Sequence, residues 1–280
     1  SVKRWTVSDV PLGVFLSGGI DSTAITCTLD RHLGQPFNTY SLVAPGSPVD
    51  ERKYIDEVGR HTRTRPFFTT VRPDDFLRDV HDFVACMEEP VAGLSAYAQY
   101  QVLKLAHGQG AKVLLDGQGG DEILAGYVYY YGYRFWELFA QLRWWRLARE
   151  MIRCRRHFRT WFPHQMFAFL LLPRGLRTAL WKRKVTPWLR HDTLECVCRG
   201  EQDPRWRRQT VRESLNQTLV STSIPHNLMW EDKSSMRWSI ESRVPFLDVH
   251  FVETALGLPT EELLTGGETK VVFRRALSRI

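Results

Sequence analysis

Residues 14–22, which read VFLSGGIDS, join a short apolar run to an amphipathic stretch through two adjacent glycines. Glycines let a backbone approach an anion closely, and the N–H groups of such a loop and of the following helix N-terminus point at it. Ser17 and Ser22 add hydroxyl donors, whereas Asp21 needs a bridging metal such as Mg²⁺. The passage therefore predicts a phosphate-binding turn, with a purely structural strand-to-helix turn as the alternative. It matches neither a Walker A loop, since no lysine follows the glycines, nor a dinucleotide fingerprint.

A second glycine-rich turn occupies residues 114–127, LLDGQGGDEILAGY, and again follows a strand-like run. The carboxyl ends of parallel strands near a topological switch point line one crevice. We therefore expect Asp121 to face Asp21 across a bound nucleotide, with both carboxylates on Mg²⁺. A turn followed by an ordinary helix cap is the structural alternative.

Short apolar runs alternate with amphipathic stretches over the first 125 residues. We expect strands at 10–16, 37–43 and 112–115, and helices at 22–32, 51–61, 73–87 and 95–107. This alternation predicts an α/β fold with a doubly wound, mainly parallel sheet and flanking helices. The turn at residues 17–22 resembles the pyrophosphate-binding loop of the ATP pyrophosphatases, and this resemblance implies an adenine nucleotide alpha hydrolase-like fold.

Residues 128–223 differ from the first 125 residues in composition. They are rich in arginine and tryptophan and are interrupted by prolines. We interpret them as a helical subdomain inserted into the α/β fold. Residues 126–225 hold 19 of the 38 Lys and Arg but 7 of the 31 Asp and Glu, a net charge of +12. A nucleic-acid-binding or RNA-modifying protein is therefore one alternative function. Helical spacing favours packing of the tryptophans between helices instead, so we do not expect a nucleic-acid partner.

A third group of motifs lies near the C-terminal end, with EDKSSM at 231–236, ESRVPFLD at 241–248 and GGETK at 266–270. Together with SGG-x-DS and DG-x-G-x-DE-x-x-x-GY, in this order, they cover nearly the whole chain. The set resembles the synthetase domain of the glutamine-hydrolysing asparagine synthetase family. That family belongs to the ATP pyrophosphatases, which release AMP and pyrophosphate.

The resemblance implies an ATP- and Mg²⁺-dependent ligase that activates a small carboxylate, aspartate or a related acid, as its adenylate. Ammonia or an amine then opens the adenylate to an amide. Leu16 and Val43 would flank the adenine, and Asp21 and Asp121 would hold Mg²⁺. The remaining implied nucleotide contacts are Ser17, Gly18, Gly19, Ser22 and Gly117.

Three charged residues are candidates for the substrate side of the site. Lys233 and Arg243 would hold a carboxylate or the triphosphate, and Glu241 would orient them or bind an amine. A buried Arg–Glu pair beside the VPFLD segment would serve structure equally well.

Gln118 departs from the family pattern, in which asparagine-forming members usually carry glutamate at this position. An amide donates and accepts hydrogen bonds but removes no proton from an attacking amine. β-Lactam synthetases also differ here. The alternative function is therefore a specialised synthetase that forms a lactam or peptide amide with an internal amine.

The resemblance also implies an N-terminal glutaminase domain, and no cysteine precedes Cys27. We therefore expect a synthetase domain over residues 1–280, truncated at both ends, and Lys270 is not expected to be the lysine of the family's mobile loop. The five scattered cysteines suggest neither disulfides nor zinc. No secretory signal or spanning segment is apparent, so we expect a cytoplasmic protein without a membrane partner. A homodimer is among the expected assemblies.

Overall fold

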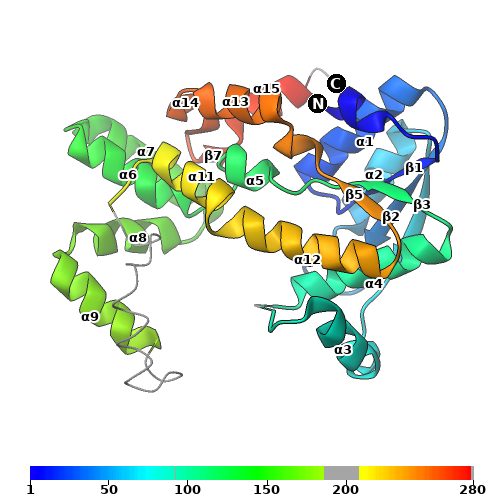
Figure 1. Ribbon diagram of the computed structural model, residues 1–280. Coiled ribbons are helices and arrows are strands. Elements are labelled where there is room, and N and C mark those ends of the chain that lie inside the picture. Colours follow the sequence, from blue (N-terminus) through cyan, green and yellow to red (C-terminus); the bar gives the residue numbers. More distant parts are fainter. Residues whose placement is uncertain (92, 186–207, 279–280) are drawn as a thin grey trace. The chain divides into compact units, whose positions relative to one another are not determined.

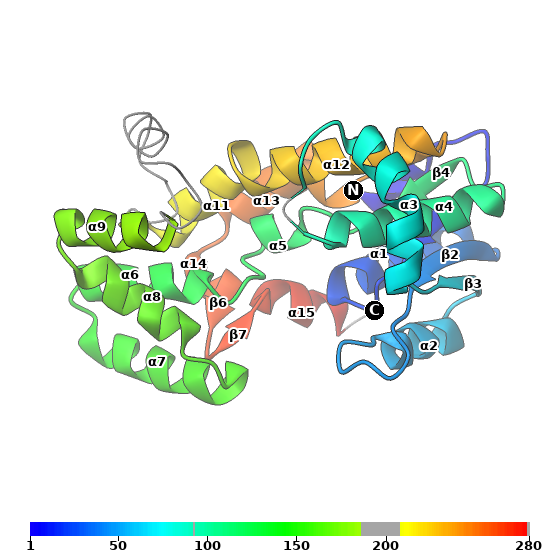
Figure 2. The same ribbon diagram turned by 90° about the horizontal axis from the view of Figure 1, so that it is seen from below.

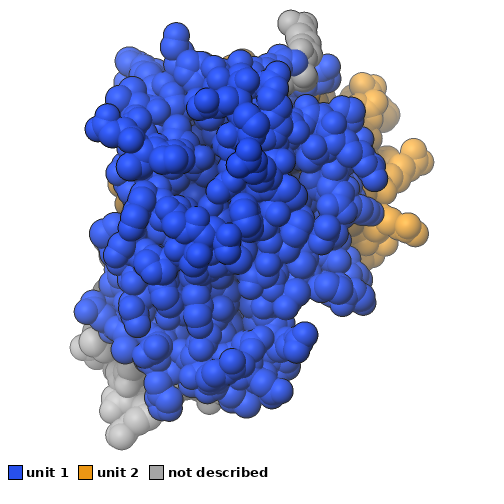
Figure 3. All heavy atoms as spheres, turned by 90° about the vertical axis from the view of Figure 1, so that its right-hand side faces the viewer, with its two compact units in different colours: residues 1–120, 223–254, 277–280 blue, residues 121–222, 255–276 orange. Residues whose placement is uncertain are grey.

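The computed structural model describes residues 1–91, 93–185 and 208–278, and for Thr178 and residues 181–185 the backbone alone. Part of the predicted helical insertion, residues 186–207, lies outside this range together with Trp188, Cys196, Cys198 and Trp206. The chain divides into two compact units, coloured in Figure 3. Unit 1 contains residues 1–120, 223–254 and 277–280, and unit 2 contains residues 121–222 and 255–276.

Unit 1 is built on a five-stranded, wholly parallel sheet with strand order β3-β2-β1-β4-β5. The strands are β1 (Leu12–Phe15), β2 (Phe37–Leu42), β3 (Thr64–Thr69), β4 (Val113–Leu115) and β5 (Glu241–Arg243). The chain moves outward from β1 to β3 and then returns to β4 on the other side of β1. The switch point therefore lies between β1 and β4, which confirms the predicted doubly wound fold.

Helices cover both faces of this sheet, as Figures 1 and 2 show. They are α1 (Ile20–Leu33), α2 (Arg52–His61), α3 (Pro73–Met87), α4 (Ser95–Gly108) and α12 (Ser223–Arg237). One core cluster joins α4 to the sheet through Val102, Leu103, Tyr40 and Leu114, with Ile240 beside them. Burying these apolar side chains stabilises the layer by about 1.5 to 3 kcal/mol for each fully buried residue.

Local sequence explains where several helices begin and end. Helix α1 ends at Gly34, whose φ of +64° is the left-handed conformation that closes many helices. Helix α3 begins with Pro73, and the Asp75 carboxylate accepts a hydrogen bond from the Arg72 N–H at 3.2 Å. The four helices expected in residues 22–107 are therefore present, with boundaries shifted by two residues at most.

Two strands of the sheet, β3 and β5, are absent from the sequence expectations. β3 is half exposed and contains Pro66, which a strand tolerates at an edge, where its missing N–H is not needed by a neighbour. β5 is a three-residue polar segment paired with β4. Neither shows the apolar run that identifies a buried strand.

Unit 2 is mainly helical. Its helices are α5 (Gly120–Ile123, starting at the last residue of unit 1), α6 (Tyr130–Ala140), α7 (Trp144–Phe158), α8 (Phe162–Leu171), α9 (Arg174–Val185), α11 (Val211–Val220), α14 (Thr260–Leu263) and α15 (Val271–Leu277), with a hairpin of β6 (Leu264–Thr265) and β7 (Glu268–Thr269). A short helix, α13 (Val249–Gly257), crosses the boundary in sequence between the units. Helix α6 packs against α7, α8 and α11. The inserted subdomain predicted at 128–223 falls largely within this unit, which also includes residues 255–276.

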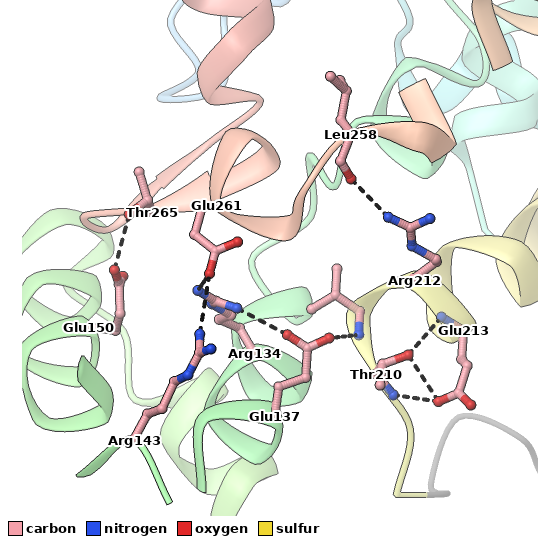
Figure 4. A network of polar contacts seen from close by, with 11 residues as sticks. Arg134, Glu137, Arg143, Glu150, Thr210, Arg212, Glu213, Leu258, Glu261 and Thr265 are labelled. Atoms are coloured by element: carbon pink, nitrogen blue, oxygen red, sulfur yellow. Dashed lines mark hydrogen bonds and ion pairs between the residues drawn. The ribbon is translucent and has the colours of Figure 1, made fainter. Parts of the chain in front are cut away.

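The polar centre of unit 2 is a set of ion pairs around Arg134, shown in Figure 4. The Arg134 guanidinium contacts Glu137 at 3.2 Å and Glu261 at 2.9 Å, and its side chain is 5% exposed. Glu137 also accepts a 2.8 Å hydrogen bond from the backbone N–H of Val211 at the start of α11. These contacts connect α6, α11 and α14.

Candidate functional site

The SGG turn begins immediately after β1 and is closed by its own hydroxyl groups. Ser17 Oγ and Ser22 Oγ lie 3.0 Å apart, and the Gly19 N–H donates to Ser17 Oγ at 3.3 Å. Gly18 has a φ of +85°, a conformation that favours glycine. Gly19 caps α1, and no side chain caps the helix. The first turn of α1 therefore presents backbone N–H groups that an anion can bind.

The second glycine-rich turn approaches the first one within unit 1. A Cβ added to Gly117 would lie 3.2 Å from the Ser22 N atom, and one added to Gly120 would lie 2.5 Å from an Asp21 carboxylate oxygen. β1 and β4 are adjacent, with Val14 in register with Leu115, so both turns leave the same edge of the sheet. Residues 117–120 therefore lie beside the first turn, and the expectation that Asp121 faces Asp21 stays a prediction.

The adenine-flanking candidates Leu16 and Val43 lie at the carboxyl ends of β1 and β2. Both are buried, and they share a cluster with Ile55 and Val58 of α2. The Leu16 N–H donates to the Tyr40 carbonyl at 3.0 Å, and the Val43 N–H donates to the Thr69 carbonyl at 2.9 Å. Each residue thus extends its strand into the edge where the glycine turns lie.

Asp121 is the first residue of unit 2, and its carboxylate forms an ion pair within that unit. Lys270 Nζ lies 2.7 Å from Asp121 Oδ1, and the lysine side chain is 4% exposed. A Cβ added to Gly126 would overlap both side chains, so glycine at this position leaves room for the pair. A role for Asp121 as a metal ligand stays a prediction, and the structure adds a cationic neighbour that the sequence did not indicate.

Arg243 and Glu241 belong to β5. The Arg243 guanidinium contacts Glu241 at 2.6 Å and donates to the carbonyl groups of Trp5 and Val7, both at 2.8 Å. Arg243 therefore connects the N-terminal segment to the sheet edge, which is a structural role, but its pair with Glu241 is not buried, because the Glu241 side chain is 58% exposed. A further role in substrate binding stays a prediction.

Lys233 lies on α12 and points at the C-terminal end of α3. Its ammonium donates to the Met87 carbonyl at 2.6 Å and lies 3.3 Å from the Glu88 carboxylate. A cation at a helix C-terminus satisfies free carbonyl groups there. These contacts fix α12 on α3, and a substrate-binding role for Lys233 stays a prediction.

A buried carboxyl pair directly behind the second turn was not anticipated. Asp116, the first residue after β4, is 8% exposed, and Glu231 of α12 is 3% exposed. Gln99 donates to Asp116 at 3.1 Å, the backbone N–H groups of Gly117 and Gln118 also donate to Asp116, and Ser242 donates to Glu231. Both residues lie in motifs quoted above, but sequence spacing gives no sign that they meet.

Burial and mutual repulsion set the protonation of this pair. Burial raises the pKa of Asp116 to about 6, although hydrogen bonds from Gly117, Glu231 and Gln99 oppose the shift. Burial, and then the negative charge of Asp116, raise the pKa of Glu231 well above its usual range. Two carboxyls in contact share a proton more readily than they both ionise. The pair therefore holds at least one proton near neutral pH.

The residues at the sheet edge fit a nucleotide with Mg²⁺. Magnesium is usually held by one or two carboxylates together with phosphate oxygens, and does not require a cage of protein ligands. Asp21 supplies a carboxylate beside the first turn of α1, and the glycines at 117 and 120 keep the adjoining backbone free of side chains. Within the described residues, no group of three or more His, Cys, Asp and Glu side chains has the arrangement of a metal site.

Comparison with known proteins gives a family match over the whole chain. A family model described as asparagine synthase matches residues 1–280. A putative glutamine-hydrolysing asparagine synthetase of Mycobacterium tuberculosis (strain ATCC 25618 / H37Rv) is 28% identical over 300 residues, covering 100% of this chain and 44% of the relative. Asparagine synthetase 1 of Bacillus subtilis is 25% identical over 295 residues, covering 100% of this chain and 45% of the relative. The chain thus spans less than half the length of these relatives.

Proposed function

The chain belongs to the asparagine synthase family, and from that membership we propose that it is the ATP-dependent, amide-forming ligase domain of a longer enzyme. One observation carries the proposal. The turns at 17–22 and 117–120 leave adjacent parallel strands and meet with backbone against backbone beside Asp21. This is the position at which open α/β sheets bind nucleotides.

In this proposal each element of the turn has a defined task. The first-turn N–H groups of α1, with Ser17 and Ser22, bind the phosphate chain, and Leu16 and Val43 border the base. Asp21 holds Mg²⁺, and Asp121 is its predicted second ligand. Bound Mg²⁺ would neutralise the charge that develops on the departing pyrophosphate. The protein contributes by positioning a carboxylate for attack on the α-phosphorus and by excluding water.

We propose that the amide nitrogen comes from glutamine-derived ammonia supplied by a glutaminase domain. The relatives' names describe them as glutamine-hydrolysing, and they extend well beyond the region matched here. Aspartate or a closely related acid is the proposed carboxylate. This assignment explains why ATP, a carboxylate and a nitrogen source would meet on one protein.

A specialised synthetase with an internal amine as nucleophile is the second candidate, and Gln118 favours it. The residue lies in the turn beside the nucleotide edge, and a neutral amide there neither attracts ammonium nor removes a proton from an amine. Comparing free ammonia with amine-bearing acids as substrates in pyrophosphate-release assays distinguishes the two. Turnover with ammonia supports the first candidate, and turnover only with an internal amine supports the second.

Calorimetric titration of Mg-ATP tests nucleotide binding without requiring turnover. We expect Mg²⁺-dependent binding by the wild-type chain and at least about tenfold weaker binding by Asp21→Asn and Asp121→Asn, because each substitution removes a ligand charge. Asp82→Asn, at an exposed position on α3, is the matched control. Thermal unfolding of each variant separates lost binding from lost structure, which matters for Asp121 because of its pair with Lys270. Unchanged affinity in a folded Asp21→Asn variant would contradict the proposal.

A further inference from the structure

Helix α7 of unit 2 presents an outward face that nothing in the proposed ligase activity requires. Trp145, Arg149, Ile152 and Arg156 follow the spacing i, i+4, i+7 and i+11, which places them on one line along a helix of 3.6 residues per turn. All four are exposed, Trp145 to 90% and Ile152 to 54%. We name these four residues the α7 stripe.

The opposite face of α7 is fixed by packing, so the stripe cannot rotate inward. Leu147, Glu150 and Cys154 are buried. The Glu150 carboxylate accepts hydrogen bonds from the Gly266 N–H at 3.0 Å and from Thr265 Oγ1 at 3.2 Å, and Figure 4 shows the contact with Thr265. A Cβ added to Gly267 would lie 2.7 Å from the Arg153 carbonyl oxygen, so the β6–β7 hairpin lies close against the helix backbone.

The charge of this face is uniformly positive. Helix α7 contains five arginines and one acidic residue, Glu150, which is buried. Arg146 and Arg153 are exposed and lie along one side of the stripe. Where the helix ends, Arg155 stacks on the exposed Trp161 ring at 4.8 Å. The exposed charges of helix α7 are therefore all positive.

We propose that the α7 stripe binds the surface of an anionic lipid membrane. The stripe alternates apolar and cationic side chains along one line, and an anionic leaflet satisfies both kinds at once. The tryptophan and isoleucine enter the boundary of the acyl chains, while the arginine stems lie alongside them and the guanidiniums bind headgroup phosphates. Each arginine near such a surface strengthens binding by about fivefold.

A nucleic acid would contact only some of the side chains on this face. Phosphates would pair with the arginines and a base could stack on Trp145, but the aliphatic Ile152 gains nothing from either contact. The earlier expectation of no membrane partner rested on the lack of a spanning segment. In the part of the chain that the structure describes, no helix has the length and apolarity needed to cross a bilayer. A helix lying on the surface needs neither property.

Co-sedimentation with lipid vesicles tests the proposal. Two kinds of vesicle are compared, one of phosphatidylcholine alone and one of phosphatidylcholine mixed with phosphatidylserine. We expect binding to the mixed vesicles only, weakening with added salt, and about 25-fold weaker in the double variant Arg149→Gln/Arg156→Gln. Arg60→Gln/Arg78→Gln removes two exposed arginines from unit 1 and is the matched control. Because the substituted side chains are exposed, all these variants are expected to fold, which unfolding curves verify.

Quenching of tryptophan fluorescence by brominated acyl chains tests whether the apolar side chains enter the lipid. Quenching should fall clearly in Trp145→Ala and remain in Leu77→Ala, which shortens an exposed leucine of α3. The proposal is overturned by an absence of binding to mixed vesicles at low salt, by equal binding of the α7 and control double variants, or by undiminished quenching in Trp145→Ala. Binding of single-stranded RNA or polyglutamate that Arg149→Gln/Arg156→Gln abolishes, without vesicle binding, would overturn it in favour of another anionic partner.

Discussion

Asp116 and Glu231 come from segments 115 residues apart in sequence and meet as a buried carboxyl pair behind the turn at residues 117–120. The Asp116 carboxylate accepts hydrogen bonds from the backbone N–H groups of Gly117 and Gln118 in this turn. Glu231, on α12, contacts Asp116 through a side-chain hydrogen bond. The proton content of the pair therefore bears directly on the geometry of the second glycine-rich turn.

The unfolding free energy should fall as pH rises through the range in which this pair titrates. The pKa of a carboxyl is about 4 in an unfolded chain, and burial raises that of Asp116 to about 6. Between these values the folded state binds more protons than the unfolded state, so stability decreases with increasing pH. Glu231→Gln should reduce this pH dependence of stability. The glutamine amide can still donate a hydrogen bond to Asp116, but it has no proton that is taken up on folding.

Urea unfolding at pH 5 and pH 8 measures this effect. We expect the wild-type chain to lose more stability than Glu231→Gln over the interval, because Glu231 gives up a proton on unfolding and a glutamine does not. Asp82→Asn controls for removing an exposed carboxylate. Parallel pH dependences of the wild-type and Glu231→Gln chains would show that the pair does not take up a proton on folding.

Gly120→Ala should impair nucleotide binding more than folding. The new methyl group would lie 2.5 Å from an Asp21 carboxylate oxygen and force that short side chain away. We expect at least about tenfold weaker binding of Mg-ATP by calorimetry, with a change in unfolding free energy of about 1 kcal/mol. Gly108→Ala, where no atom would contact the new methyl group, is the control. Wild-type affinity in Gly120→Ala would argue against the turn as the nucleotide site.

Arg134→Ala should destabilise unit 2 strongly. It leaves Glu137 buried without its cation, and breaking a buried ion pair in this way costs about 3 to 5 kcal/mol. Arg143→Ala removes an arginine that is 47% exposed and 3.9 Å from Glu261, so it should cost about 1 kcal/mol or less. Equal losses in the two variants, measured by urea unfolding, would mean that the network in Figure 4 is not the source of this stability.

Arg243→Ala should release the N-terminal segment. The substitution removes both hydrogen bonds to the carbonyl groups of Trp5 and Val7. Amide hydrogen exchange of residues 2–8 should become faster by about tenfold or more, since two charge-assisted hydrogen bonds are lost. Arg237→Ala, at a half-exposed arginine of α12, is the control. Unchanged exchange in Arg243→Ala would exclude this role.

The α/β half of the fold could be predicted because its signals are local. Buried parallel strands form apolar runs, glycines mark the turns, and helical periodicity is clear in α1 to α4. The candidate residues Ser17, Gly18 and Gly117 come from the same turns, and their role in nucleotide binding stays a prediction.

The remaining features depend on contacts that spacing does not encode. Edge strand β3 contains a proline, and β5 is recognisable only by its pairing with β4. Glu231 and Asp116 become a pair only when α12 packs beside β4. Lys270 was noted in the sequence, but its contact with Asp121 depends on the fold of unit 2.

Unit 1 is completed by residues 223–254, which supply β5, α12 and Glu231 after the 102 residues of positions 121–222. On the ribosome, β4 therefore emerges long before its outer neighbour, and one edge of the sheet stays open during that delay. Unpaired edges invite association with other chains. The time taken to translate residues 121–222 thus sets how long the β4 edge stays unpaired.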